Sequence, residues 1–209
     1  LVMANERKNN SKIVNPHDKF IRETLGRKEI ARDLIKVYLP STIIKHINLK
    51  TLKISKDTHI DKELTDHFSD IIYTVELKGK KSFIYFLFEH KSYPDKLALF
   101  QVLRNMVKIW EDSIKQNRNI KKLPVIVPIL LYHGKKAWQY SNNSDILFEI
   151  VEGTEKYVPT FSSELFDVSH IPDRDIKGEI LTQIILLILK YIFKPELSDK
   201  LDQIFDLFN

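Results

Sequence analysis

Asp70, Glu89 and Lys91 are the residues whose types and spacing are best suited to chemistry in this chain. They stand at the ends of two runs rich in Ile, Val, Tyr and Phe, within residues 69–92, and a glycine-containing turn joins the two runs. This pattern predicts a β-hairpin. Glu89 and Lys91 would share one face of their strand, because strand side chains alternate. Two carboxylates and an ammonium group on one face indicate a site for a hard metal ion and a phosphate.

The register of the predicted hairpin decides whether the two carboxylates meet. A two-residue loop at Gly79-Lys80, of the type II′ kind that begins with glycine, would pair Lys78 with Lys81. The same register places Asp70 directly opposite Glu89, where Cβ atoms lie about 4.5–5.5 Å apart. Facing carboxylates repel each other unless they share a cation or a proton. A bulge that shifted the pairing by one residue would break this arrangement.

Hydrophobic periodicity predicts the elements that position these residues. Their order predicts an α/β fold, in which a mixed sheet is flanked by helices. The apolar run over 124–132 is typical of a strand buried on both faces, and Pro128 within it favours an edge position or a local bend. We expect helices over 17–25, 28–38, 42–46, 95–117, 175–193 and 196–208, strands over 48–54 and 124–132, and further β-structure over 145–151 and 157–168.

Composition narrows the class of protein. The 209 residues carry a net charge of +5, which permits nucleic acid as a partner without requiring it. No cysteine is present, so disulfides and thiolate metal sites are excluded. The start of the sequence is polar, and the longest apolar run, over 184–189, is far shorter than the roughly 18 residues of a membrane span, so we expect a cytoplasmic protein without a membrane partner. Phosphate-binding glycine loops and the HExxH zinc motif are absent, so no nucleotide cofactor is expected.

Asp70, the hairpin after it and Glu89-x-Lys91 at a strand end form a pattern that resembles the core of the PD-(D/E)XK nuclease superfamily. More specifically, the chain resembles the recombination-promoting nuclease (Rpn, YhgA-like) family. The resemblance implies a restriction-endonuclease-like fold and a DNA endonuclease that uses Mg²⁺ or another divalent cation, linked to recombination or mobile elements. The resemblance to the family extends through residues 15–25 (NPHDKFIRETL), 31–40 (ARDLIKVYLP), 61–79, 85–111 and 123–138 (LPVIVPILLYHGKKAW).

The resemblance also assigns roles to single residues. Asp70 and Glu89 match the family's metal-binding acidic positions, and Lys91 matches the third position of the motif, where it would stabilise charge or position a water. Glu23 stands where related folds sometimes place a further acidic ligand, although a glutamate on a helix surface is usually solvated. Gln101 is a candidate polar helper on the long helix, with an ordinary helix face as the alternative.

Basic and aromatic positions near the motif have weaker assignments. His133 either lines the cleft or only ends a strand. Lys96, Arg104 and Lys108 are candidates for contacts with DNA phosphates, which would make binding depend on salt, and a solvated helix face is the alternative for each.

Composition, periodicity and the resemblance together divide the chain into three parts. Residues 1–14 are expected to be a disordered tail, 15–170 the nuclease domain, and 171–209 C-terminal helices that form a truncated extension. An inactive DNA- or protein-binding module with the inherited fold is the alternative to an active enzyme, and a structural fragment is a third interpretation. The oligomeric state cannot be read from the sequence.

Overall fold

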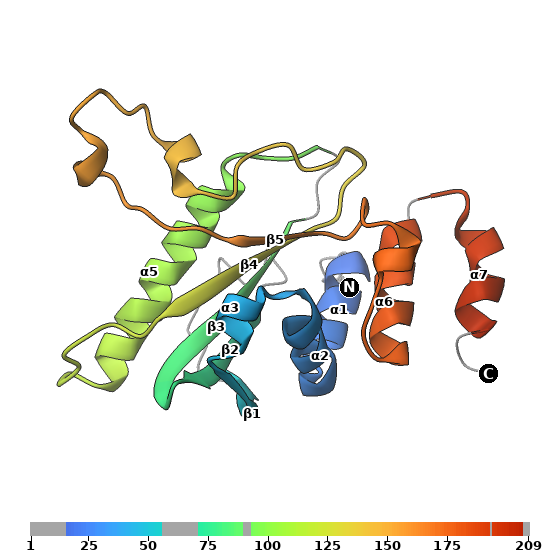
Figure 1. Cartoon of the computed structure of the whole chain (residues 1–209), viewed down its shortest axis with the longest axis horizontal. Helices are drawn as coiled ribbons and strands as arrows, with labels where there is room; N and C mark the ends of the chain where they lie inside the picture. Colours follow the sequence, from blue (N-terminus) through green and yellow to red (C-terminus); the bar gives the residue numbers. More distant parts are fainter. Residues whose placement is uncertain (1–15, 56–70, 90–92, 193, 207–209) are drawn as a thin grey trace, which may run out of the picture.

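A single mixed sheet organises the part of the chain that the computed structural model describes, residues 16–55, 71–89, 93–192 and 194–206 (Figure 1). Its strand order is β1-β2-β3-β4-β5. The strands β1 (Ile47–Ile54), β2 (Ile71–Leu77) and β3 (Lys80–Glu89) pair antiparallel. The strands β4 (Ile126–Tyr132) and β5 (Glu164–Asp167) continue the sheet parallel to β3. The predicted α/β fold with a mixed sheet is confirmed.

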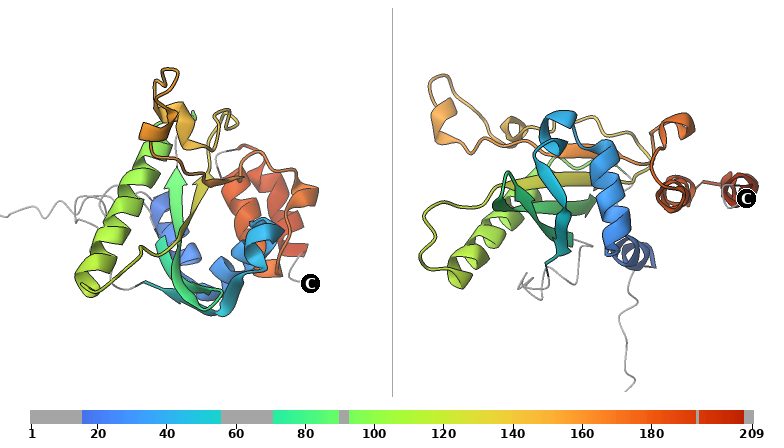
Figure 2. Two further views of the ribbon diagram at one scale, coloured as in Figure 1. Left: turned by 60° about the vertical axis from the view of Figure 1, so that its left-hand side comes forward. Right: turned by 60° about the horizontal axis from the view of Figure 1, so that its bottom comes forward.

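Helices cover both faces of this sheet (Figure 2). The two cores follow from strand alternation: Ile84 and Phe86 of β3 pack in the larger core, with α1, α2 and α6, whereas Tyr85 packs in the smaller core under α5. The apolar residues over 83–86 of β3 are therefore explained by burial on both sides of the sheet. The helices are α1 (Pro16–Leu25), α2 (Lys28–Tyr38), α3 (Ser41–Ile44), α5 (Ala98–Gln116), α6 (Ile180–Tyr191) and α7 (Leu197–Asp206), all within or close to the predicted ranges.

The turn between β2 and β3 differs from the prediction. Leu77 pairs with Lys80, so Lys78 and Gly79 form the two-residue loop, with φ of 49° and 75°. Positive φ at both central residues defines a type I′ turn, which favours glycine in the second position. The Lys78 N–H donates to the carbonyl oxygen of His46 at 3.0 Å, which fastens the turn to the start of β1. The predicted type II′ loop at Gly79-Lys80 is therefore wrong.

This correction changes the basis for the predicted carboxylate pair. Pairing Lys78 with Lys81 was the premise that set Asp70 opposite Glu89, and the observed register is shifted by two residues. A shift of two preserves the face to which each strand position belongs, because side chains alternate with a period of two. Asp70 itself lies outside the described residues.

The segment between β4 and β5 forms less β-structure than predicted. Residues 145–151 contain the end of a short 3₁₀ turn, η1 (Ser144–Leu147), and a second turn, η2 (Glu155–Tyr157), follows before β5. We call the segment between β4 and β5 that contains η1 and η2 the arm. Hydrogen bonds hold its base: Ser144 Oγ donates to the Pro159 carbonyl at 2.9 Å and accepts from the Phe161 N–H at 3.0 Å. An isolated antiparallel bridge joins Asn143 to Ser162 at the base of this arm. Beyond the bridge the arm projects from the sheet in Figure 1, and no strand of the described sheet pairs with it.

The edge position predicted from Pro128 is wrong, because β4 lies between β3 and β5. Pro128 pairs with Tyr85 of β3, whereas the pairing of β4 with β5 begins one residue later, at Ile129. A proline without an N–H is tolerated where a ladder bond is not required.

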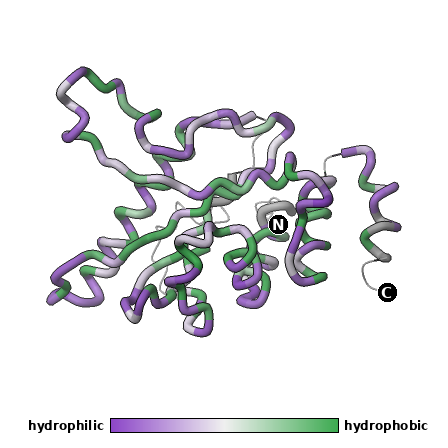
Figure 3. Tube along the Cα trace, in the orientation of Figure 1, coloured by the Kyte–Doolittle hydropathy of each residue, from purple (hydrophilic) through white to green (hydrophobic). Residues whose placement is uncertain are grey.

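Figure 3 shows hydrophobic residues gathered along the strands and α6, with hydrophilic residues in the loops. None of the helices in the described ranges is long and apolar enough to span a bilayer.

Candidate functional site

Three strands end on one level at the same edge of the sheet. Glu89, the last residue of β3, pairs with Tyr132 at the end of β4, and Tyr132 pairs with Asp167 at the end of β5. β2 runs in the opposite direction, and its first residue, Ile71, lies beside Phe86 at the same end. The carboxyl ends of parallel strands are where open α/β sheets place their binding sites. We call this row of strand ends the carboxyl edge.

The structure places only part of the predicted catalytic set. Glu89 occupies its expected position at the end of β3. Asp70, Lys91 and the side chain of Glu89 lie outside what the structure describes. The assignment of Asp70, Glu89 and Lys91 as catalytic residues therefore stays a prediction.

A buried polar pair lies between β3 and α5. Tyr85 and Asn105 are 0% and 2% exposed, and Asn105 Nδ2 donates to the Tyr85 hydroxyl at 2.6 Å. Gln101 precedes Asn105 by one helical turn, and its Oε1 is buried without a hydrogen-bond partner within the described ranges. A buried acceptor left unsatisfied costs about 1–3 kcal/mol, so such groups are usually kept for a reason.

The loop after β4 is fixed by two residues of the carboxyl edge. The Tyr132 hydroxyl donates to the Lys136 carbonyl at 2.7 Å, and its ring lies 5.2 Å from that of Trp138. The backbone N–H of Trp138 donates to Asp167 Oδ2 at 3.0 Å. His133, the first residue of this loop, is only 2% exposed. These contacts hold the loop against the edge, and burial there is compatible with either role predicted for His133.

Asp167 is a residue of this edge that the sequence analysis missed. Its Oδ1 lies 2.9 Å from His170 Nδ1, and its Oδ2 accepts from Trp138, so both oxygens have partners. These contacts make it a residue that positions the loops on either side. The sequence signal was an Asp directly after Leu165-Phe166, but so short a strand could not be recognised from periodicity.

The remaining predicted residues lie away from the carboxyl edge or on the surface. Glu23 is exposed on α1 and forms an ion pair with Lys19 at 3.8 Å, which fits the solvated alternative. Lys96, before α5, and Arg104, on α5, are exposed, and Lys108 is half-buried.

The described residues alone do not form a metal site. They contain no group of three or more His, Asp or Glu side chains arranged to hold a metal ion. The predicted donors, the carboxylates of Asp70 and Glu89, are oxygen ligands of the kind that Mg²⁺ takes together with water and phosphate. The chemistry of the predicted donors thus fits a hard divalent cation.

The fold and the edge together define a class. A mixed five-stranded sheet with helices on both faces, a hairpin at its centre and a glutamate at the carboxyl edge is a restriction-endonuclease-like α/β fold. Within that class the chain belongs to the family described as "Putative transposase, YhgA-like", which matches residues 15–209.

Curated relatives have similar sequences over most of this chain. Recombination-promoting nuclease RpnA of Escherichia coli (strain K12) is 30% identical over 190 residues, which are 90% of this chain and 64% of the relative. RpnC of the same strain is 29% identical over 191 residues, 90% of this chain and 62% of the relative. A protein named "Inactive recombination-promoting nuclease-like protein RpnE" is 29% identical over 192 residues, 91% and 63% of the two chains.

The chain thus spans less than two thirds of the length of these relatives. No solved structure matches it significantly.

Proposed function

We propose that this chain is a metal-dependent DNA endonuclease, linked to recombination, whose site lies at the carboxyl edge. The observation that carries the proposal is Glu89 at the end of β3, level with the ends of two parallel strands, in a chain whose family includes proteins named recombination-promoting nucleases. An acidic residue at this point ends a strand whose residues 83–86 are buried. Such a position suits a carboxylate that must bind a cation while staying anchored to the core.

The proposed site uses the face of the sheet that α5 covers. Ile72 and Tyr85 pack in the core beneath α5. Asp70 is two residues from Ile72, and Glu89 is four from Tyr85, so alternation along the strands assigns both carboxylates to this face. The corrected register would make them diagonal neighbours, which long side chains can still bridge through one ion.

Each residue then has a chemical role. Asp70 and Glu89 would hold the cation, and Lys91 would donate hydrogen bonds to the phosphate or to the attacking water. A bound divalent cation supplies Lewis-acid polarisation of the phosphate and lowers the pKa of water. The water oxygen forms a new bond to phosphorus, the bond to the leaving oxygen breaks, and that oxygen takes up a proton.

Residues beneath the edge would keep this geometry rigid. Tyr85 and Asn105 fix α5 against β3, and Tyr132 fixes the loop that begins at His133. Gln101 offers a buried amide oxygen on the same helix face as Asn105, which suits a helper that accepts a hydrogen bond from the site. Lys96, exposed just before α5, is the strongest of the predicted candidates for a phosphate contact.

A second candidate function is a binding module without catalysis. The observation that favours it is that RpnE, a relative named inactive, is as similar to this chain as the relatives named nucleases. The module would bind DNA or protein through the same fold without cutting.

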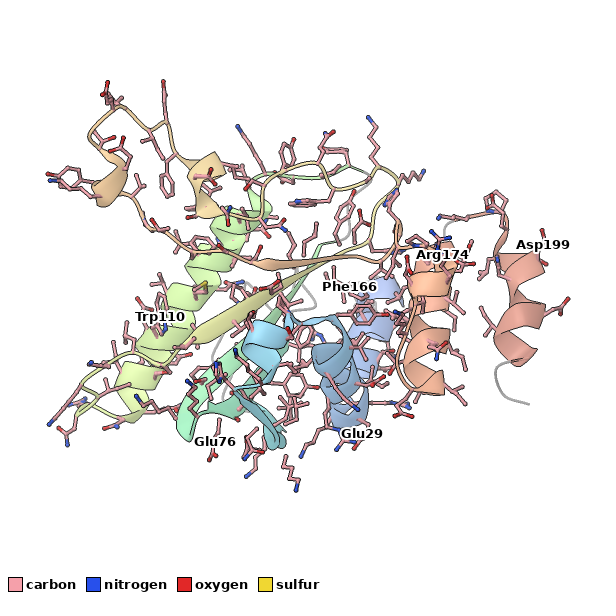
Figure 4. All side chains as sticks on the ribbon, in the orientation of Figure 1. Glu29, Glu76, Trp110, Phe166, Arg174 and Asp199 are labelled. Carbon is pink, nitrogen blue, oxygen red and sulfur yellow. The ribbon has the colours of Figure 1, made fainter. Side chains whose placement is uncertain are left out.

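A plasmid-cleavage assay distinguishes these functions. We expect the unchanged chain to nick supercoiled plasmid with Mg²⁺ and not with EDTA, and Asp70→Asn or Glu89→Gln to lower the rate at least about 100-fold. Glu76→Gln is the matched control, because Glu76 is an exposed carboxylate near the other end of β2, far from the carboxyl edge (Figure 4). Circular dichroism confirms that each variant is folded.

The outcomes separate the alternatives. Cleavage by Asp70→Asn at the rate of the unchanged chain would overturn the assigned site. DNA binding that survives EDTA, with no nicking in any divalent cation, would instead support the binding module.

A further inference from the structure

The outward face of α5 carries a stripe of residues with heptad spacing. Successive members are three, four, three, four and three residues apart, which is the spacing of the a and d positions of a coiled coil. The inward face of the same helix uses different residues, which pack on β3 and β4. We call the outward stripe the α5 seam; its members are Leu97, which is the N-cap of α5, and Phe100, Arg104, Val107, Glu111 and Ile114 within the helix.

The α5 seam is unusually apolar for a surface. A helix that covers one face of a sheet normally turns a polar side to solvent. Leu97 and Phe100 are each 53% exposed, Val107 is 42% exposed and Ile114 is 44% exposed. An exposed row of this kind, as narrow as a coiled-coil seam, indicates a helical partner.

We propose that the α5 seam pairs antiparallel with the α5 seam of a second copy of this chain. In antiparallel coiled coils, the residues at heptad position a of one helix face the residues at heptad position d of the other. This register sets Leu97 against Ile114 of the second copy. The same register sets Arg104 against Val107, and Phe100 against Glu111. The two-fold axis then passes between Arg104 and Val107.

Charge decides the orientation of the two helices. Helical side chains lean toward the N-terminus of their own helix. In the antiparallel pair, Arg104 therefore leans toward Glu111 of the second copy, and Glu111 leans back toward Arg104, so that two equivalent ion pairs form. A parallel pair would set each of these residues beside its own copy, and like charges opposed in a seam are destabilising.

The α5 seam thus gives Arg104 a role other than the phosphate contact expected from the sequence. The proposed dimer does not depend on nuclease activity, because the seam faces away from the core that supports the carboxyl edge. One helix pair buries less than the roughly 1,200 Å² of a standard interface, so the dimer should form with rising concentration.

Sedimentation velocity of the full chain tests the proposal. We expect a shift from monomer to dimer as the concentration rises, lost in Arg104→Glu and in Glu111→Arg, and restored when the two changes are combined. Lys53→Glu is the matched control, since Lys53 is an exposed cation on β1 and lies outside α5. A monomer at every concentration, or a double variant that stays monomeric while folded, overturns the proposal.

Engineered cysteines test the orientation, and the absence of native cysteine makes them unambiguous. Leu97→Cys and Ile114→Cys proteins are mixed with oxidised glutathione, which takes up the electrons as each disulfide forms. Antiparallel pairing predicts disulfides that join one variant to the other. Disulfides within each variant alone would show a parallel pair and contradict the charge argument.

Discussion

Asp173 is held in its charged form by three hydrogen-bond donors. It accepts hydrogen bonds from Lys190 Nζ at 2.6 Å, from Lys200 Nζ at 2.9 Å and from the Tyr191 hydroxyl at 2.9 Å. Burial alone would raise the pKa of this carboxyl, but these bonds lower the pKa to about 2. Asp173 thereby joins η3 (Asp173–Asp175) to α6 and α7.

The pH dependence of stability should report this residue. Because the pKa of Asp173 is lower in the folded chain than in the unfolded one, its contribution is present above about pH 4 and is lost as the pH falls toward 2. Asp173→Asn should reduce the free energy of unfolding by about 1 kcal/mol at pH 6, allowing for solvent screening, and by much less near pH 2. Urea unfolding at the two pH values measures the difference. Asp175→Asn, on an exposed neighbour, should show no such loss.

Single residues also show where sequence reasoning ends. Glu89 could be placed at a strand end because six apolar residues precede it. The role of Asp167 depends on Trp138, 29 residues away, and the buried pair of Tyr85 and Asn105 depends on how α5 is oriented over β3. No local pattern records such contacts, because they form only after the elements have packed.

Elements with strong periodicity were predictable, and their connections were not. The apolar stripes of α2 and α5 fixed those helices to within a few residues. The hairpin register depended on whether Gly79 came first or second in its turn, and the contact of Lys78 with His46 belongs to tertiary structure. The arm before β5 carried an apolar pattern like that of a strand, but it has no neighbouring strand to pair with among the described residues.

Gly178 lies just before α6, at a position that requires glycine. It has a φ of 119° and precedes Glu179, whose N–H donates to Asp33 Oδ2 at 2.7 Å, so that α6 begins against α2. A Cβ at position 178 would collide with Asp33 Oδ2. Strain and the disturbed hydrogen bond should make Gly178→Ala less stable by about 2–3 kcal/mol.

Gly153 supplies the control for this change. It has a φ of 85°, and a Cβ there would meet no atom within 4 Å. Gly153→Ala should therefore cost only the backbone strain, about 1 kcal/mol. Thermal unfolding of both variants measures the difference, and equal losses would contradict the role given to Asp33.

At the scale of the whole molecule, α6 belongs to the same core as the sheet. Ile184, Ile185 and Leu189 pack in the cluster that contains Tyr73 and Phe86. The boundary at residue 170 that the resemblance suggested stays a prediction, since a change in sequence similarity need not coincide with a boundary in packing. Periodicity identified α6 as strongly apolar, but only packing shows which surface it covers.

Truncation tests how far this core extends. A chain ending at residue 179 should fail to fold, because the larger core would lose α6 and expose its apolar face to water. A chain ending at residue 195 keeps α6 and loses α7, so it should fold with a lower melting temperature. Circular dichroism and solubility distinguish the two. A stable, cooperatively unfolding chain that ends at residue 179 would show that the sheet does not require α6.

The contacts beneath the carboxyl edge have a consequence for how such a chain changes over generations. Tyr85 and Asn105 join β3 to α5, and Tyr132 holds the loop after β4, without using the acidic side chains proposed for the reaction. Selection for folding therefore conserves these three residues but does not act on the carboxylates proposed for the reaction. If cleavage is no longer selected for, a single codon change at Glu89 would abolish the proposed activity. The chain would still fold, so proteases and chaperones would not remove it. Silent copies of such a gene are then expected to persist as folded proteins rather than disappear.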